Sequence, residues 1–313
     1  MTAAADAAPP AFRHEAFLYH GQDDFLAGVG GFLHEGLADG DLAVVAAPAD
    51  RLPPLRDVLG PAADDVRFLD MAEIGGNPSR IIAVWAEALA EATAHGRGLR
   101  GVGEPAFPGR RAVEFDECHL HELLLNSAFD PGPGWRLMCP YDAERLPEPV
   151  RDRALRSHPE WSSTGDRGTT AQLPTSVDAA FSAPLVPPAG AALRGPFGRD
   201  DVPAVRRTVA AWARSCGLPV DRVEVLALAA SELATNAVVH GGGAGVLSLW
   251  EEPGAVVLEV HDSGRFTDPL AGRRPPGPGA EGGAGLYLVN QLADLTQLRS
   301  GPEGTTVRVT TWR

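Results

Sequence analysis

Short apolar runs alternate with helical patterns through the first half of the chain. The runs HEAFLYH, DLAVVAAP, VRFLD, RGLRGVGEP and WRLMCPYD predict strands, and the segments between them, including Ser79 to His95 and Glu114 to Asn126, predict helices. Strands and helices in this alternation form βαβ units. We therefore expect an α/β domain whose mainly parallel sheet carries helices on both faces.

The last third of the chain has a different pattern. Two helical segments, Val202 to Cys216 and Asp221 to His240, come first, and the runs VLSLW and AVVLEV then predict a hairpin around the turn EEPG. A further helix is expected from Leu286 to Asp294, followed by a closing strand in TTVRVTTW. Helices on one face of a mixed sheet predict an α+β sandwich.

The segment between these blocks shows neither a helical nor a strand period. Residues 162–198 mix Ser, Thr, Pro and Gly, which is typical of a linker. The sequence thus predicts a disordered start at 1–11, a first domain at 12–161, a linker at 162–198 and a second domain at 199–313. A length of 313 residues suits two domains, each large enough for a core of its own.

The composition of the chain excludes several classes of enzyme and binding protein. The chain has no lysine, so all 27 basic residues are arginine, and this excludes a P-loop lysine, a Schiff-base lysine and the strand lysine of eukaryotic-type protein kinases. The net charge is −14, of which residues 1–161 carry −12 and residues 162–313 carry −2. This acidity argues against sequence-nonspecific nucleic-acid binding.

Neither a targeting signal nor a disulfide is expected. The sequence has no run of about 20 apolar residues, and the start MTAAADAAPP lacks a basic and an apolar region, so we expect a cytoplasmic protein without a membrane segment. The three cysteines, Cys118, Cys139 and Cys216, are scattered and odd in number, which predicts free thiols.

Residues suited to catalysis gather in the second block. Glu232, Asn236 and His240 are spaced four apart, so they share one face of a helix. Taken alone, such a stripe also fits a solvated helix face. The strand AVVLEV ends in HDSG, and glycines precede the next helix, where backbone amides and the helix dipole can hold a phosphate without lysine.

In this order the motifs resemble the GHKL or Bergerat ATP-binding fold, and within it the bacterial anti-sigma-factor serine/threonine kinases. SELATNAVVHG is similar to their N box, VHDSG to their G1 box and GGAGLYLVNQLAD to their G2 box, and the resemblance covers residues 199–313. It implies that the domain binds ATP with Mg²⁺, the ion being held through Asn236. It also implies that Glu232 is the base that deprotonates a protein serine or threonine, and that Asp262 accepts a hydrogen bond from the adenine amine. The implied nucleotide contacts further include Glu232, Gly264, Gly282, Gly283, Gly285, Leu286 and Thr305.

The sequence departs from this family pattern in two places. Arg265 and Phe266 follow HDSG where many relatives have a second glycine, and the segment from Thr267 to Gly279 is rich in proline. Both departures bear on ATP affinity and turnover. An alternative function therefore stays open, in which the domain binds nucleotide, or only a partner, and transfers no phosphate.

The resemblance also implies partners. The protein substrate would be an anti-sigma-factor antagonist, and a sigma factor would be the second partner. The first domain would control the kinase in response to a small-molecule signal that the sequence does not identify. A monomer and a homodimer both fit the sequence, and no direct contact with nucleic acid or membrane is expected.

The first block carries no phosphate cradle. Asp23 and Asp24 stand at the strand-to-helix junction where a RecA-like ATPase has its phosphate loop. At this point the block resembles the MEDS sensory domain, a RecA-like domain without a P-loop. The matching pieces, over residues 12–161, are HEAFLYHGQDDFLAGVGGFLHEGLADGD, Glu104, EFDECHLHELL, CPYD and SHPEW.

Two sets of polar side chains in the first block are candidate ligand positions. One helix carries residues that could bind a metal ion, and Cys139 could add a ligand or a redox partner. The commoner outcome for such a helix is a solvated acidic face with a buried cysteine. The residues of this helix are Glu114, Cys118, His119, His121 and Glu122. A second set of side chains at the strand ends could line a pocket for a small ligand. Alternatively, these side chains simply pack in the interior of the domain. The residues of this second set are His20, Tyr19, Glu104, Tyr141, Asp142 and His158.

Overall fold

The chain forms two compact units in a computed structural model that describes residues 12–129, 132–170, 176–186, 190–277 and 284–313. The first unit comprises the described residues up to Gly75 together with 84–175, and the second comprises 76–83 and 176–313. Within the described ranges, no helix has the length and apolar character that a membrane crossing requires. The predicted disordered start at 1–11 lies outside these ranges.

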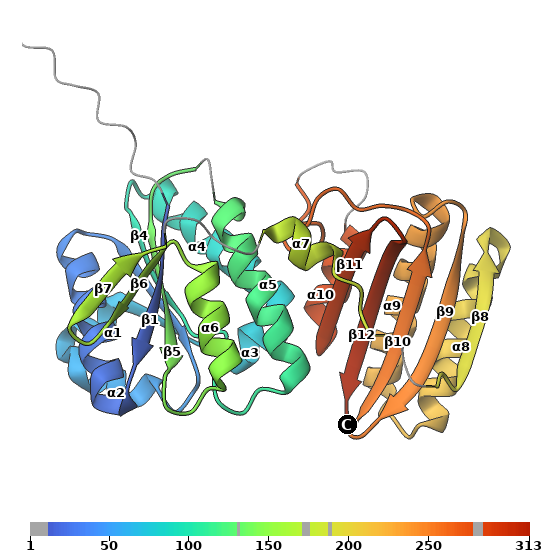
Figure 1. The fold of residues 1–313 in the computed structure, drawn as a ribbon, viewed down its shortest axis with the longest axis horizontal. Coiled ribbons are helices and arrows are strands. Elements are labelled where there is room, and N and C mark those ends of the chain that lie inside the picture. Colours follow the sequence, from blue (N-terminus) through green and yellow to red (C-terminus); the bar gives the residue numbers. More distant parts are fainter. Residues whose placement is uncertain (1–11, 130–131, 171–175, 187–189, 278–283) are drawn as a thin grey trace, which may run out of the picture. The chain divides into compact units, whose positions relative to one another are not determined.

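The first unit is built on a seven-stranded sheet with the strand order β3-β2-β4-β5-β1-β6-β7 (Figure 1). All neighbouring strands are parallel except β6 and β7, which form an antiparallel pair at one edge. The strands are β1 (Arg13–Tyr19), β2 (Leu42–Ala47), β3 (Val66–Asp70), β4 (Leu99–Gly103), β5 (Arg136–Asp142), β6 (Glu160–Ser163) and β7 (Asp166–Thr169).

Helices cover both faces of this sheet (Figure 1). Side chains alternate along β1, so that Phe17 and Tyr19 join a core with Phe25 and Leu55, while His14 faces the opposite side. The helices are α1 (Gly21–Ala38), α2 (Leu52–Leu59), α3 (Met71–Gly75), α4 (Ile81–Ala94), α5 (Ala112–Ala128) and α6 (Glu148–Ser157), with the 3-10 turn η1 (Gly60–Asp65). The 3-10 turn η2 (Pro78–Arg80) and residues 81–83 at the start of α4 belong to the second unit.

The second unit is a five-stranded antiparallel sheet with the order β11-β12-β10-β9-β8. Three helices, α8, α9 and α10, lie on one face of it (Figure 1). The elements are α7 (Val177–Ser182), β8 (Leu193–Gly198), η3 (Arg199–Asp201), α8 (Val202–Ser215), α9 (Val220–Val239), β9 (Ala244–Glu252), β10 (Ala255–Asp262), α10 (Ala284–Leu292), β11 (Leu295–Gly301) and β12 (Gly304–Trp312).

The predicted fold classes are confirmed in both units. A parallel sheet with helices on both faces makes the first unit α/β, and helices on one face of an antiparallel sheet make the second an α+β sandwich. The second sheet is wholly antiparallel rather than mixed. The strand β11 was not predicted, because its sequence LTQLRSG has polar residues at several positions that the fold nevertheless buries.

Regular elements also occur within residues 162–198, where the sequence showed no period. This range contains β7, α7 and β8. The sequence LRGPFG of β8 lacks apolar alternation, and its main chain is held in strand geometry by antiparallel pairing with β9, from Leu193 opposite Leu249 to Gly198 opposite Ala244. Pairing with a neighbouring strand thus outweighs the local Gly and Pro content.

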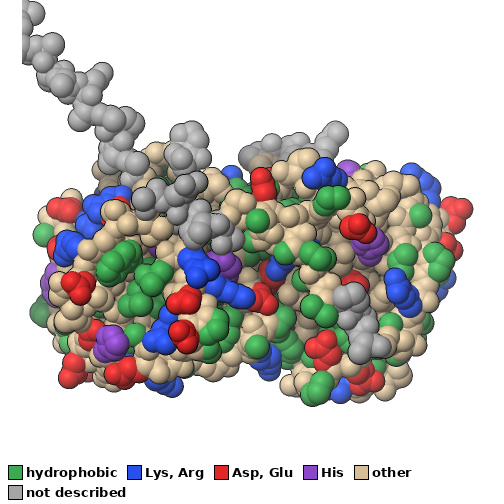
Figure 2. Space-filling model, viewed as in Figure 1, with side chains coloured by type: hydrophobic (Ala, Val, Ile, Leu, Met, Phe, Trp, Pro, Cys, Tyr) green, Lys and Arg blue, Asp and Glu red, His purple; other side chains and the backbone are tan. Residues whose placement is uncertain are grey.

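Charged side chains of both signs are interspersed on the molecular face drawn in Figure 2. Arginine side chains lie among acidic ones there, and apolar side chains occur as separate patches between them. The net charge of −14 is therefore not gathered into one acidic field on this face.

Candidate functional site

A cavity of about 300 Å³ opens in the second unit. Its size is at the lower end of the range for small-molecule sites. It lies where the end of α9, the end of β10, the following loop, the start of α10 and the start of β12 meet. The lining residues are Asn236, His240, Gly241, Asp262, Gly264, Arg265, Phe266, Thr267, Asp268, Ala271, Gly272, Leu286 and Thr305.

The helix α9 supplies Asn236 and His240, one turn apart, to this cavity. The amide N–H of His240 makes a helical hydrogen bond to the carbonyl of Asn236 at 2.8 Å, and the helix ends here because glycines follow. Gly242 and Gly243 have φ angles of +92° and +93°, a conformation that favours glycine. The glycine run therefore stops the helix and leaves the Asn236 amide at the mouth of the cavity.

Glu232 lies one turn before Asn236 and contacts a different element. Its carboxylate occupies the space that a Cβ atom at Gly285 would need, at the start of α10. Only a glycine at that position leaves room for the acid. The structure thus places Glu232 beside the helix N-terminus that follows the predicted phosphate loop.

The end of β10 holds Asp262 beside two glycines. The Oδ1 atom of Asp262 accepts a hydrogen bond from the amide N–H of Gly264 at 2.7 Å. A Cβ atom at Gly264 would stand 2.6 Å from the Cα atom of Gly241 and 2.6 Å from the carbonyl oxygen of His240, so the two segments approach as only glycine allows. Burial raises the pKa of Asp262 above its ordinary value.

Thr305 fixes the same loop from the neighbouring strand. It lies opposite Asp262 in the pairing of β10 with β12, and its hydroxyl donates to the carbonyl oxygen of Gly264 at 2.9 Å. The hydroxyl of Ser300 lies 2.9 Å from that of Thr305 and accepts the amide N–H of Phe266 at 2.9 Å. Sequence reasoning missed Ser300, because no motif marks a side chain that reaches the loop from an adjacent strand.

The predicted phosphate loop is only partly described. Gly282 and Gly283 lie outside the described residues, whereas Gly285 and Leu286 lie in the first turn of α10, and Leu286 is buried and lines the cavity. Gly272, which was not predicted, has φ +72° and packs so closely on Leu286 that its Cβ would lie 2.6 Å from Cγ of that residue. An isolated glycine in a proline-rich segment gave no signal of this contact.

The first unit has acids in place of a phosphate cradle at the start of α1. Asp24 accepts a hydrogen bond from the amide N–H of His20 at 2.8 Å, so this carboxylate occupies a main-chain amide at the N-terminus of α1, where a phosphate-binding loop would offer free amides. His20 itself is exposed, and its ring lies 4.0 Å from the carboxylate of Glu144.

Three of the predicted strand-end residues meet in a buried cluster. The hydroxyl of Tyr19 donates to Oε1 of Glu104 at 2.8 Å, and Arg51 donates to the Tyr19 hydroxyl at 2.9 Å and to Asp142 at 3.2 Å. Burial raises the pKa of Glu104 to about 8, although Tyr19 and Arg51 oppose the shift. Arg51 was not predicted, yet it follows β2 closely, and its place near a strand end was the available signal.

Tyr141 and His158 do not join this cluster. They meet Glu122 instead: the Tyr141 hydroxyl donates to Oε1 of Glu122 at 3.0 Å, and Nε2 of His158 lies 3.3 Å from Oε2. The structure therefore divides the predicted strand-end set between two buried polar groups.

The acidic face predicted for the helix over 114–125 is buried rather than solvated. Glu114, Glu117 and Glu122 have exposed fractions of 6%, 0% and 1%. Partners explain two of these burials, since Glu114 accepts from the amide of Arg111 and Glu122 is surrounded by His14, Tyr141 and His158.

The cysteine and the two histidines of α5 do not gather into one metal site. The Cys118 thiol donates to the carbonyl of Pro105 at 3.2 Å, and burial raises its pKa to about 12. Burial lowers the pKa of His119 to about 4. In the group of potential ligands found among the described residues, Glu122 and Cys139 join His14 and His158, whereas Cys118, His119 and His121 are absent. Cys118 is buried, as the sequence predicted for the cysteine of this helix, and all three cysteines are free thiols.

Each of the two units matches a known family. The model of the histidine kinase-like ATPase domain matches residues 196–311, and that of the MEDS domain, the methanogen/methylotroph DcmR sensory domain, matches residues 13–159. The serine-protein kinase RsbW of Halalkalibacterium halodurans is 31% identical over 116 residues, which are 33% of this chain and 72% of that protein. The chain belongs to the RsbW family.

A solved structure also matches part of the chain. The crystal structure of the RsbU and RsbW domains of a Mycobacterium tuberculosis protein aligns with a TM-score of 0.28 and 18% identity, over 38% of this chain and 32% of that one. The chain thus spans about a third of the length of that solved chain.

The residues of the RsbW-family cavity suit a nucleotide with a hard divalent cation. Gly241 and Gly264 pack closely around Asp262, which lines the cavity, and the second carboxylate oxygen of Asp262 can accept from an amine. Asn236 offers an amide oxygen, the type of ligand that Mg²⁺ takes. A family of histidine kinase-like ATPase domains implies ATP use, and these donors are compatible with it.

Proposed function

We propose that the chain is an anti-sigma-factor-type serine/threonine protein kinase, which transfers the γ-phosphate of ATP to a serine or threonine of a protein partner. One observation carries the proposal. Asn236 lines the cavity, and Glu232, one helical turn away, lies against the first turn of α10, where a phosphate chain would be met by main-chain amides. A carboxylate and a cation-binding amide are thus one turn apart at the expected place of transfer.

The chain's own residues have separate roles in this proposal. Asp262 and Thr305 orient the base-binding end of the cavity, since one carboxylate oxygen is held by Gly264 and the threonine hydroxyl holds the carbonyl of the same glycine. Asn236 binds the cation. Bound Mg-ATP supplies the phosphoryl group, and Glu232 takes the proton from the Oγ atom of the acceptor serine or threonine.

The proposed partners follow from membership in the RsbW family. The acceptor is an anti-sigma-factor antagonist, a sigma factor is the second partner, and the protein acts in the cytoplasm on transcription. The MEDS unit senses a small molecule and sets the activity of the kinase unit, which requires that the signal favour one of two states of the full chain.

A second function is favoured by Arg265 and Phe266, which line the cavity. The amide of Phe266 is held by Ser300, so the large side chains that replace a small residue are carried on a fixed loop. In this alternative the domain binds nucleotide, and through it a partner, without transferring phosphate.

A transfer assay tests the proposal. The full-length protein is incubated with ATP labelled at its γ-phosphate and a purified anti-sigma-factor antagonist, and the label on serine or threonine of the antagonist is measured. We expect transfer by the wild type, loss of transfer with retained ATP binding in Glu232→Gln, and wild-type transfer in Glu224→Gln, whose side chain is exposed on the same helix.

The same assay separates the two functions. Wild-type turnover in Glu232→Gln would remove this residue from the mechanism. A wild-type protein that binds both ATP and the antagonist but moves no label would overturn the kinase proposal in favour of the binding module.

A further inference from the structure

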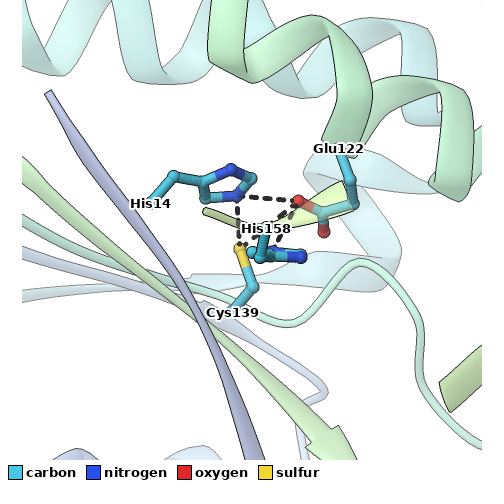
Figure 3. A group of neighbouring side chains, drawn as sticks. All are labelled: His14, Glu122, Cys139 and His158. Atoms are coloured by element: carbon cyan, nitrogen blue, oxygen red, sulfur yellow. Dashed lines mark hydrogen bonds and ion pairs between the residues drawn. The ribbon is translucent and has the colours of Figure 1, made fainter. Parts of the chain in front are cut away.

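Four side chains from four separate segments converge in the interior of the first unit (Figure 3). His14 comes from β1, Glu122 from α5, Cys139 from β5, and His158 from the residue that follows α6. Each is at most 1% exposed. One nitrogen, oxygen or sulfur atom of each lies within 4.8 Å of those of the other three.

The individual distances are short. Oε2 of Glu122 lies 3.0 Å from Nε2 of His14, 3.3 Å from Nε2 of His158 and 3.5 Å from Sγ of Cys139. Sγ of Cys139 lies 3.4 Å from Nε2 of His14. Figure 3 shows the four groups directed at a common point between them.

Hydrogen bonds on the outer side of the cluster fix which nitrogen of His14 faces inward. Nδ1 of His14 lies 3.0 Å from Oδ1 of Asn126. The amide nitrogen of Asn126 donates to the carbonyl of Ser157 at 2.7 Å, so its oxygen must be the atom that faces the ring. Nδ1 of His14 therefore carries the hydrogen, and its Nε2 lone pair is directed into the cluster.

His158 is arranged in the same way. Its Nδ1 lies 2.8 Å from the carbonyl oxygen of Ala154, so Nδ1 carries the hydrogen here too. The Tyr141 hydroxyl donates to Oε1 of Glu122, which leaves Oε2 as the inner atom. Imidazoles held through Nδ1–H by an amide or carbonyl oxygen, with Nε2 free to coordinate, are the usual outer arrangement of a metal site.

These groups need a positive centre. Two imidazole lone pairs and a carboxylate oxygen point at each other in the buried interior, and such an arrangement is costly unless a proton or a cation lies between them. Arginine, which neutralises buried acids elsewhere in this lysine-free chain, is absent from the four residues of the cluster. A divalent cation would satisfy all four groups at once.

The ligand types and spacing select the metal. Two imidazole nitrogens, a thiolate and a carboxylate are borderline-soft ligands, which suit Zn²⁺ rather than Mg²⁺ or Ca²⁺. For tetrahedral zinc with Zn–N of about 2.0 Å and Zn–S of about 2.3 Å, ligand atoms are separated by roughly 3.3 Å between nitrogen and oxygen and roughly 3.6 Å to sulfur. The four measured distances, 3.0 to 3.5 Å, lie close to these values.

We propose that His14, Glu122, Cys139 and His158 form a closed binding site for a divalent cation of the zinc class in the MEDS unit. All four positions are protein ligands and all are buried, so the site leaves no coordination position for a substrate and serves structure or sensing. Binding converts the Cys139 thiol to a thiolate and releases its proton to solvent, together with any proton shared by the two histidines.

Cobalt serves as the spectroscopic probe, and zinc titration gives the affinity. The full-length protein is stripped with a chelator, and Zn²⁺ binding is measured by calorimetry, while Co²⁺ loading is followed by the thiolate-to-cobalt charge-transfer absorption. We expect one ion per chain, a charge-transfer band, and a higher unfolding midpoint with Zn²⁺.

Variants assign the ligands. Cys139→Ser should lose the charge-transfer band and weaken Zn²⁺ binding by more than about 100-fold, whereas Asn126→Ala should keep the band and weaken binding roughly 10- to 100-fold, as expected for a supporting hydrogen bond. The matched control is Cys118→Ser, which changes the other buried cysteine of the unit and should keep both properties.

A double variant covers the case in which Cys139→Ser does not fold. In Cys118→Ser/Cys216→Ser, Cys139 is the one cysteine left in the chain, so a charge-transfer band must come from it. If the folded wild type binds neither Zn²⁺ nor Co²⁺ stoichiometrically, or the double variant binds Co²⁺ without the band, the site is a hydrogen-bonded network and the proposal is wrong.

Discussion

The carboxylate of Glu232 and the main chain of Gly285 are in direct contact across two helices. Glu232 belongs to the middle of α9, and Gly285 is the second residue of α10, so the acid lies at the positive end of the α10 dipole. The position of the proposed base is therefore set by a residue that has no side chain.

This contact predicts the effect of Gly285→Ala. The added methyl group must push the carboxylate away from its place, and since a displacement of about 1 Å can cost roughly 100-fold in rate, we expect a loss of that order in kcat with the fold retained. Phosphotransfer kinetics and circular dichroism provide the measurement. Gly277→Ala is the control, because no atom lies within 4 Å of a Cβ there. Equal rates in the two variants would contradict the proposed role of the contact.

Asn236→Ala should weaken Mg-ATP binding about 10- to 100-fold, because the cation loses its amide ligand from the chain. Calorimetric titration of the full-length protein measures this, with Thr235→Ala, exposed on the same helix, as the control. If Asn236→Ala binds Mg-ATP as tightly as the wild type, ATP binds without this ligand or at another place in the chain. The acids at the start of α1 argue against a site in the first unit.

Asp262→Asn should reduce ATP affinity by about tenfold or more and reduce the preference for ATP over GTP, because an amide nitrogen in place of a carboxylate oxygen cannot accept from the adenine amine. Competition binding with both nucleotides gives the result. Asp268→Asn changes another acid of the same cavity, one that caps the amide of Leu270, and should leave the preference unchanged. An Asp262→Asn protein with wild-type selectivity would mean that the base is recognised by other groups.

The buried carboxyl of Glu104 predicts a pH dependence of stability. Its pKa is about 8 in the folded state against 4.5 ordinarily, so its contribution to stability is fully present below about pH 4.5 and is lost as the pH rises through about 8. Relative to Glu104→Gln, whose amide does not titrate, the wild type should lose at most about 1.4 kcal/mol of unfolding free energy per pH unit in this window. Denaturant titrations at several pH values test this. The exposed Glu87→Gln is the control and should follow the wild type at every pH. A pH-independent difference between the wild type and Glu104→Gln, or an equally large pH-dependent difference between the wild type and Glu87→Gln, would contradict the assignment.

The fold of the second unit could be predicted well from the sequence because its signals are local. Glu232 and Asn236 share a helix face through their spacing, and Asp262 ends a strand that its apolar run defines. What the sequence did not give is the loop support from Ser300 and the contact of Gly272 with Leu286, since both depend on which strand or helix lies next to the loop.

The first unit shows the limit of such reasoning more clearly. The sequence suggested a metal site among Glu114, Cys118, His119, His121 and Glu122 of one helix, but a helix face that packs on a sheet meets strand residues instead. His14 and Cys139 come from β1 and β5, whose pairing sets Ala16, not His14, opposite Cys139. The sheet order, which brings these two strands together, could not be obtained from the periodicity of either one.

The central position of β1 has a consequence for how the first unit folds. The first strand of the sheet pairs with β5 on one side and β6 on the other, and both follow it only after nearly the whole unit. Pairing of this kind raises the contact order, which slows folding because long loops must close before the contacts form. The strands β2, β3 and β4 can assemble early, whereas β1 must wait for the end of the unit to arrive. Until then β1 lacks the partners of both its edges, so this strand is open to pairing with other chains while the rest of the unit is made.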